Sequence, residues 1–362
     1  MRPYGKLGIA VLILTLIPLA ASMSLTNGPS ASIGTSDAVS GVYSTTNAQI
    51  FAMGSIQSAV DAAKSGDTIF LWPKTYYENV LVPKSLNIVG SGALWTIVDG
   101  SKPTDPNFGS VFAIGMDKQG KYVPGVTATL DGLTIRKGTG TLIPNMNMRY
   151  GGGIFNDKST LTVKNCIISD NTADLCGGVA NVADVGGTAT MTMMNNQIFG
   201  NTATTAGAGG VGNLGADIGS TATMTLINNN IFWNTAHVVG AGVGNAADVG
   251  GAATMTLRNN NIFRNTAKYD GGGISNTVYY GTATLNVINS QIFGNTAGNG
   301  GGIYNLVSAS GTAIVNLQSG SIDHNVATKP SPSGGGIYND HGTINGNQGI
   351  VHDNTPDQVV NA

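Results

Sequence analysis

The chain has 362 residues, of which only 10% are charged, and its formal net charge is −2. So little charge offers no bulk attraction for nucleic acid or an anionic membrane, and we expect no nucleic-acid partner. Gly is abundant at 53 residues, yet no collagen-like triplet period occurs. Cys166 and Cys176 are too few for a disulfide framework, and they leave open one local bridge or two buried thiols.

The first residues have the pattern of an export signal. Arg2 and Lys6 precede an uncharged apolar run over 7–21, and small residues suited to cleavage follow it. The run is shorter than the roughly 20 residues that a membrane-spanning helix needs. We therefore predict a signal peptide at 1–23 and a secreted or cell-surface location, with retention as an anchor as the alternative. No other stretch is long and apolar enough to span a membrane, and 24–48 has the composition of a flexible linker.

Residues 49–362 are predicted to form one β-helix domain that begins with a short helix. The segment 55–64 places its apolar residues on one helical face, and a Gly stands where the helix should end. Such a helix would cover the open apolar end of a stack of strands. Residues 101–126 and 139–150 interrupt the alternating pattern and are expected to be projecting loops. Strands are predicted at 68–71, 80–82, 86–89, 96–98 and 129–135.

A unit of about 30 residues repeats from residue 151 onward. Each copy has a Gly-rich entry, an alternating apolar stretch and the phrase Ile-Phe-x-Asn-Thr-Ala or a variant of it. A fixed period of this length is typical of one structural unit stacked on copies of itself. The Asn of the phrase recurs at intervals of 29 to 33 residues, at Asn171, Asn201, Asn234, Asn265, Asn295, Asn325 and Asn354.

Three short strands per unit, without an intervening helix, predict an all-β fold: a single-stranded right-handed parallel β-helix of about ten turns. Equivalent residues of successive turns then lie about 4.8 Å apart, so aliphatic columns such as Ile198, Ile231 and Ile262 fill the interior. Asn is expected at the bends, because it tolerates left-handed backbone geometry and its amide hydrogen-bonds the next turn. Two further Asn columns are expected to do the same: Asn165, Asn195, Asn228, Asn259 and Asn289, and Asn156, Asn181, Asn213, Asn245, Asn276, Asn305 and Asn339.

The position just before the first Asn column varies freely in side-chain type and is therefore expected to face solvent. It is occupied by Asp170, Gly200, Trp233, Arg264, Gly294, His324 and Asp353.

Two stretches resemble known families. The Gly-Gly-Gly-Ile-x-Asn and Ile-Phe-x-Asn-Thr-Ala phrases resemble the repeats of chlamydial polymorphic outer-membrane proteins, although Ile stands where that family has Phe. Residues 55–100, with Gly66-Asp67-Thr68 and Ile97-Val98-Asp99-Gly100, resemble the opening of pectin-lyase-like β-helix proteins. These resemblances imply a pectin-lyase-like solenoid and a secreted or cell-surface, adhesin-like role.

Two acidic groups are candidate sites. Asp323-His324 on one turn and His352-Asp353 on the next should stack, with Asp323 beside His352 and His324 beside Asp353. They suit acid–base catalysis or a divalent metal, and the alternative is an exposed polar patch.

A second acidic series recurs in a bend that precedes a Gly. Three stacked carboxylates repel one another unless a cation such as Ca²⁺ lies among them, and the alternative is an Asp that hydrogen-bonds its own turn. No other cofactor is indicated. The three residues are Asp184, Asp217 and Asp248.

Four Phe residues stack in one column. Facing outward, they would offer a contact surface for sugar rings or a partner protein, and the alternative is that they pack under a loop. They are Phe199, Phe232, Phe263 and Phe293.

We therefore predict an exported, non-catalytic β-helix surface protein with a role in cell-surface structure, adhesion or carbohydrate contact. The partners expected are a cell-surface polysaccharide or protein. The alternative is a polysaccharide lyase or glycoside hydrolase acting on a uronan, since both chemistries need placed carboxyl or basic groups. A second alternative is an envelope-lattice or filament subunit that associates end to end through unpaired strands.

Overall fold

A computed structural model describes residues 48–143, 146–330 and 333–362. The chain divides into two compact units, and all described residues belong to the second, Thr35–Ala362. The predicted signal peptide and the linker up to residue 47 lie outside the described residues. Within those ranges, no helix has the length and apolar character required to cross a bilayer.

Helix α1 (Ile56–Ala62) is the predicted capping helix. Its N-cap Ser55 accepts a hydrogen bond from the Ser58 backbone N–H, and the carboxylate of Glu78 accepts from the backbone N–H groups of Ile56 and Gln57. These contacts satisfy helix N–H groups that have no partner within the helix. Its apolar residues pack into the main core, so the helix covers the first turn as predicted. One 3₁₀ helix, η1 (Gln348–Ile350), lies near the other end.

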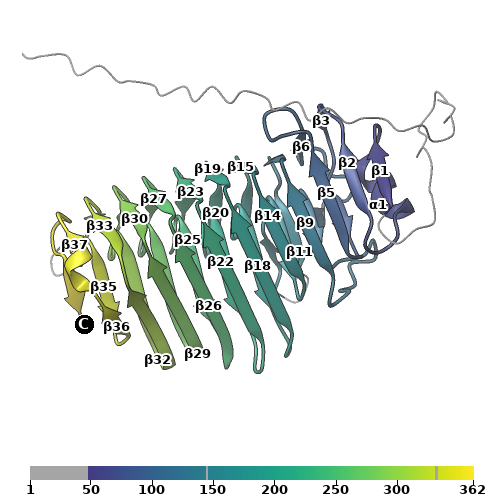
Figure 1. Ribbon diagram of the computed structural model, residues 1–362. Coiled ribbons are helices and arrows are strands. Elements are labelled where there is room, and N and C mark those ends of the chain that lie inside the picture. Colours follow the sequence, from purple (N-terminus) through teal and green to yellow (C-terminus); the bar gives the residue numbers. More distant parts are fainter. Residues whose placement is uncertain (1–47, 144–145, 331–332) are drawn as a thin grey trace, which may run out of the picture. The chain divides into compact units, whose positions relative to one another are not determined.

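Three sheets build the rest of the domain, and their strands succeed one another along the stack in sequence order (Figure 1). The 19-stranded sheet contains β1 (Gln49–Ala52), β2 (Thr68–Leu71), β4 (Val80–Val82), β5 (Leu86–Gly90), β8 (Phe112–Ile114), β9 (Thr127–Asp131), β13 (Ile154–Asp157), β14 (Thr160–Lys164), β17 (Val179–Ala183), β18 (Thr188–Met194), β21 (Val211–Gly215), β22 (Thr221–Ile227), β25 (Val243–Ala247), β26 (Gly251–Arg258), β29 (Ile274–Ile288), β32 (Ile303–Leu317), β35 (Ile337–Asp340), β36 (Thr343–Gly346) and β38 (Val359–Asn361). The ten-stranded sheet contains β3 (Thr75–Tyr76), β6 (Ile97–Asp99), β10 (Thr134–Arg136), β15 (Ile167–Ser169), β19 (Gln197–Phe199), β23 (Asn230–Phe232), β27 (Asn261–Phe263), β30 (Ser290–Phe293), β33 (Gly320–Asp323) and β37 (Val351–His352). The nine-stranded sheet contains β7 (Phe108–Gly109), β11 (Gly140–Ile143), β12 (Met148–Tyr150), β16 (Thr172–Leu175), β20 (Thr202–Ala206), β24 (Thr235–Ala236), β28 (Thr266–Ala267), β31 (Thr296–Ala297) and β34 (Val326–Ala327).

Parallel pairing in register confirms the predicted parallel β-helix. In the ten-stranded sheet Ile198 pairs with Ile231, and Ile231 with Ile262, so equivalent residues of successive windings are direct neighbours. All three are completely buried in one continuous core. A winding such as β21 to β24 contains four strands rather than the three predicted, because the Thr-Ala that follows each repeated Asn forms the nine-stranded sheet. In β29 and β32 the first two strands of the winding are joined into one.

The first Asn column forms a buried ladder. The Nδ2 of Asn201 donates to Oδ1 of Asn234 at 3.0 Å, and the same Oδ1 accepts from the Asn201 backbone N–H at 3.0 Å. The same contacts join successive members from Asn171 to Asn354, where Oε1 of Gln358 accepts the last pair of hydrogen bonds. All members have their side chains inside, so the ladder satisfies backbone groups that the tight bend leaves unpaired.

At this bend the residue with left-handed backbone geometry is the one immediately before the ladder Asn, not the ladder Asn itself. Every member of that variable column has a positive φ, including Trp233 and Arg264, both at 54°. The prediction that the ladder Asn adopts the left-handed conformation is therefore wrong by one residue, because two adjacent residues share the bend.

At the second bend, too, the left-handed conformation and the buried side chain belong to two adjacent residues. Asn195, Asn228 and Asn259 are exposed with φ between 56° and 57°, while the next residue of each pair supplies a buried ladder that sequence analysis missed. That ladder consists of Asn196, Asn229 and Asn260 and ends on the Ser290 hydroxyl. The third predicted column, from Asn156 to Asn339, is buried throughout and joins amide to amide between neighbouring windings.

The predicted loops are partly strands. Within 101–126, β8 is a strand of the 19-stranded sheet, and within 139–150, β11 and β12 pair antiparallel at the end of the nine-stranded sheet. Together the two segments cover a second apolar cluster outside the main core, which includes Met116, Tyr150 and Phe155.

The two cysteines are free, buried thiols, so no disulfide bridge joins them. Cys166 belongs to the main core, whereas Cys176 lies in the second cluster beneath the covering segments. Burial raises the pKa of the Cys176 thiol to about 11 and that of Cys166 to about 12, which leaves both protonated and unreactive at neutral pH.

Candidate functional site

The outer face of the ten-stranded sheet carries the four Phe residues. In each strand the middle Ile points inward, so the residues on either side of it point outward. Adjacent rings of the column are stacked, with centroids 5.0 Å apart and planes within 18° of parallel. The Phe side chains are half-buried. They line the surface of the sheet in a column parallel to Gln197, Asn230, Asn261 and Gln291.

Because the Phe rings stack on one another, little of their ring faces is left open to a ligand. Each inner ring has both faces against its neighbours, so the rings present C–H edges to solvent rather than open faces. An open aromatic surface lies beside the column at Trp233, which is 57% exposed and packs edge-on against Phe232 at 5.1 Å.

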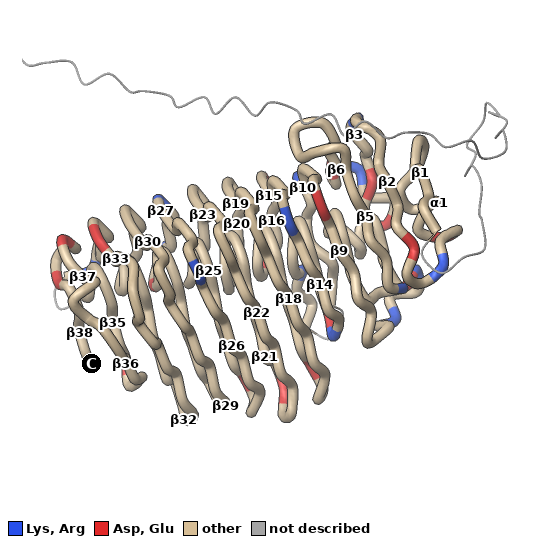
Figure 2. Tube along the Cα trace, viewed as in Figure 1, with Lys and Arg blue, Asp and Glu red and all other residues tan. Residues whose placement is uncertain are grey.

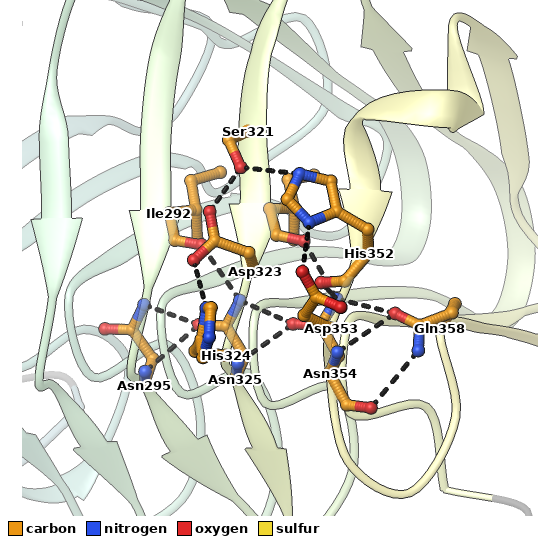
Figure 3. Close-up of polar contacts among 11 residues, drawn as sticks. Ile292, Asn295, Ser321, Asp323, His324, Asn325, His352, Asp353, Asn354 and Gln358 are labelled. Atoms are coloured by element: carbon orange, nitrogen blue, oxygen red, sulfur yellow. Dashed lines mark hydrogen bonds and ion pairs between the residues drawn. The ribbon is translucent and has the colours of Figure 1, made fainter.

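A polar cluster continues this face at the C-terminal windings (Figure 3). Asp323 pairs in register with His352 and lies next to Phe293 of the preceding winding, which places the cluster directly after the aromatic column. Ser321 donates to Oδ2 of Asp323, and its Oγ lies 3.2 Å from Nε2 of His352. Nδ1 of His352 lies 3.0 Å from Asp353 Oδ2.

His324 contacts its own winding rather than the next. Its Nδ1 lies 2.7 Å from Oδ1 of Asp323, and only its backbone N–H reaches the Asp353 carbonyl oxygen. The hydrogen bond with Asp323 raises the pKa of His324. Burial opposes the charge of Asp323, but hydrogen bonds from Ser321 and His324 outweigh it and lower the pKa of that carboxyl.

The order Ser321, His352, Asp353 is that of a nucleophile, a base and an orienting acid. However, the Ser321 hydroxyl donates its hydrogen bond to Asp323 rather than to His352. The His324 side chain is 72% exposed and that of His352 is 49% exposed. In this arrangement Ser321 lacks the hydrogen bond to a base that would activate it as a nucleophile. Sequence analysis missed Ser321, although it precedes Asp323 by two residues on the same strand and must share its face.

The recurring bend carboxylates each have a separate partner. Asp184 Oδ1 lies 2.5 Å from Nζ of Lys158, Asp217 Oδ2 accepts from the Val185 backbone N–H, and Asp248 accepts from the N–H of the residue after it. The described residues contain no group of three or more His, Cys, Asp or Glu side chains placed to hold a metal.

Asp157 is a functional candidate that sequence analysis missed. It ends β13, is only 1% exposed, and neither of its carboxylate oxygens accepts a hydrogen bond. Lys158 Nζ lies 3.6 Å from Oδ2 of Asp157 and 4.3 Å from the ring centroid of Tyr122. Burial, followed by the nearby Asp184 carboxylate, raises the pKa of Asp157 to about 7. No sequence motif indicated this site, because the side chains around Asp157 include Tyr122 and Tyr150, which come from segments outside the repeat pattern.

The cavity at Asp157 and Asp184 limits what can bind there. It is bordered by Tyr122, Tyr150 and Phe155, and its volume of about 20 Å³ is room for about one water molecule. A sugar ring does not fit without movement of the covering segments.

No family model and no curated relative matches the chain. Among solved structures, the crystal structure of Escherichia coli YbhC is similar over 93% of this chain and 88% of that chain, at 14% identity and a TM-score of 0.39. The A-module of the mannuronan C-5 epimerase AlgE4 from Azotobacter vinelandii is similar over 80% of this chain and 89% of that chain, at 15% identity and a TM-score of 0.33. These likenesses are too distant to carry an argument about function. The fold rests on the strand pairing described above, and the resemblance to chlamydial proteins remains one of sequence motifs.

Proposed function

We propose that the protein is an exported β-helix that acts at the cell surface without catalysing a reaction. Its role would be to contact carbohydrate through the outer face of the ten-stranded sheet. The supporting observation is the continuous outward column of four stacked Phe rings beside a column of four amide side chains. Amides hydrogen-bond hydroxyl groups and aromatic carbons pack against sugar C–H groups, which together suit a glycan running along the stack.

A glycan array probed with the mature protein tests this proposal. A double variant, Asn230→Ala with Asn261→Ala, should weaken the glycan binding found on the array, because both amides face outward beside the rings. The control variant is Thr225→Ala with Thr256→Ala, which alters the outer face of the 19-stranded sheet by a similar amount. Absence of glycan binding, or equal loss in both double variants, would contradict the proposal.

One observation favours the enzymatic alternative, a lyase or hydrolase acting on a uronan. A carboxyl group with a raised pKa near a second carboxylate is suited to general acid–base catalysis, and Asp157 and Asp184 border one cavity with Lys158 Nζ close to both. Because that cavity holds only about one water molecule, this alternative requires the covering segments to move when substrate binds. Incubation with polygalacturonate and alginate, followed by ultraviolet absorbance and reducing-end assays, tests this alternative. Product formation that disappears in Asp157→Asn would establish it in place of the non-catalytic role.

A further inference from the structure

The left-handed column before the buried Asn ladder contains two residues that its geometry disfavours. Gly200 and Gly294 adopt this conformation without strain, and Asp and His are tolerated there. Trp233 and Arg264, on adjacent windings, are bulky and have φ of 54°. A left-handed conformation strains a residue that has a Cβ, because the Cβ approaches the following carbonyl oxygen.

Neither side chain compensates for this strain by anchoring the fold. Trp233 is largely exposed and makes one ring contact, with Phe232. The Arg264 side chain is exposed and forms no ion pair or hydrogen bond with any described residue. Because Gly occupies the same position on the flanking windings, the bend does not require these side chains. Backbone strain of this kind is characteristic of sites that contact ligands.

The winding of Arg264 carries positive charge without ion-pair partners among the described residues. No Lys or Arg occurs between residues 165 and 257, and then Arg258, Arg264 and Lys268 follow within one winding. Figure 2 shows how few charged positions the middle windings carry. No Asp or Glu occurs from 249 to 269, and none of the three cations is ion-paired within the described chain, whereas Asp270 is held by Lys329.

Aromatic side chains extend this surface around the bend toward β24 and β28. Nζ of Lys268 lies 5.0 Å from the ring centroid of Tyr269. That ring in turn packs edge-on against His237, on the winding of Trp233, with centroids 6.1 Å apart. The bend between the ten-stranded and nine-stranded sheets thus presents aromatic and cationic groups together on two adjacent windings.

We propose that this surface binds an acidic polysaccharide, with Arg264 pairing to sugar carboxylates and the exposed Trp233 ring packing against the sugar. This inference rests on the proposed carbohydrate contact and specifies its ligand class and its site. The planar guanidinium donates two parallel hydrogen bonds to a carboxylate, and the open indole face supplies the stacking surface that the Phe column lacks.

Oligogalacturonate and its fully methyl-esterified form test the inference by calorimetric titration, because they differ only at the carboxyl group, which is a charged carboxylate in one and a neutral methyl ester in the other. The wild-type protein should bind the acidic form roughly fivefold more tightly at low salt, and the preference should shrink as salt rises. Arg264→Gly should abolish the preference, and Trp233→Gly should weaken binding of both forms. Asp170→Gly is the matched control, since it makes the same backbone change in the same column and should leave binding unchanged.

All three variants place Gly where other windings already have it, so each should fold. An Arg264→Gly protein that keeps the full preference for the acidic form would overturn the inference. Equal wild-type binding of both forms would also overturn it while leaving the proposed carbohydrate contact intact. Binding of neither form would likewise overturn the inference, whereas the proposed carbohydrate contact is decided separately by the glycan array.

Discussion

Replacing Asn265 with Ala tests the buried ladder that joins successive windings. The Asn265 side chain is fully buried, and its Nδ2 donates to the carbonyl oxygen of Ile231 at 3.0 Å. Its Oδ1 accepts from the backbone N–H and from Nδ2 of Asn234, both at 3.0 Å. In Asn265→Ala, the Asn234 N–H and the Ile231 carbonyl lose these partners inside the protein, where water cannot replace them.

The expected loss follows mainly from the Asn234 N–H, because the Ile231 carbonyl oxygen keeps its place in the parallel ladder between β23 and β27. A buried polar group left without a partner costs about 1–3 kcal/mol, so Asn265→Ala should lower the free energy of unfolding by about that amount. Asn261→Ala is the matched control on the same winding. Asn261 is exposed in an extended strand, and its Nδ2 donates one hydrogen bond to Oδ1 of Asn230, so its loss should stay within about 1 kcal/mol.

Hydrogen exchange is the decisive assay, because stacked windings unfold locally and a single global transition is not assured. The Asn234 amide should lose protection in Asn265→Ala and keep it in Asn261→Ala. Guanidinium unfolding followed by circular dichroism supplies the overall change. If the two variants lose equal stability, or if Asn234 stays protected, the buried ladder does not hold the windings together and the reasoning fails.

Three further changes test other parts of the structure. The raised pKa of Asp157 means that its contribution to stability is complete below the unfolded value near 3.8 and is lost as pH rises through about 7. Asp157→Asn should therefore gain melting temperature relative to wild type between pH 5 and pH 8, and a constant difference would contradict the burial of this carboxyl. Asp323→Asn should lower the pKa of His324 in an NMR titration, because the hydrogen bond from that carboxylate raises it, and an unchanged titration would remove the contact. Gln358→Ala should accelerate hydrogen exchange in the last winding by removing the acceptor at the end of the ladder, whereas unchanged exchange would show that this end needs no terminating acceptor.

Periodicity made the interior of this fold predictable. Ile198 and Ile231 could be assigned to one buried column because strands in register bring equivalent residues together, and the pairing confirms it. The bends were less predictable, since the sequence shows two adjacent residues at each bend and only backbone geometry separates their roles. At one bend the left-handed residue precedes the buried Asn201, and at the other it is the exposed Asn195 that precedes Asn196.

At the candidate sites, too, some side-chain neighbours were predictable from the repeat and others were not. Contacts between neighbouring windings, such as Asp323 with His352, followed from the repeat and could be anticipated. The environment of Asp157 could not, because Tyr122 and Tyr150 reach it from segments that lie outside the repeat pattern. A repeat predicts the neighbours that stacking creates, but it does not predict what an irregular segment covers.

A stack of near-identical windings also shows where side chains are free of structural demands. At a position where Gly200 and Gly294 fold without a side chain, the presence of Trp233 and Arg264 is not required by the backbone and works against it. The inner columns differ, since every winding there supplies an aliphatic or amide group that the core needs. Comparison of one winding with the next therefore separates residues that build the solenoid from residues available for binding. By that criterion the bend at Trp233 and Arg264, which adjoins the self-stacked Phe column at Phe232, is the part of this face on which a ligand should first be sought.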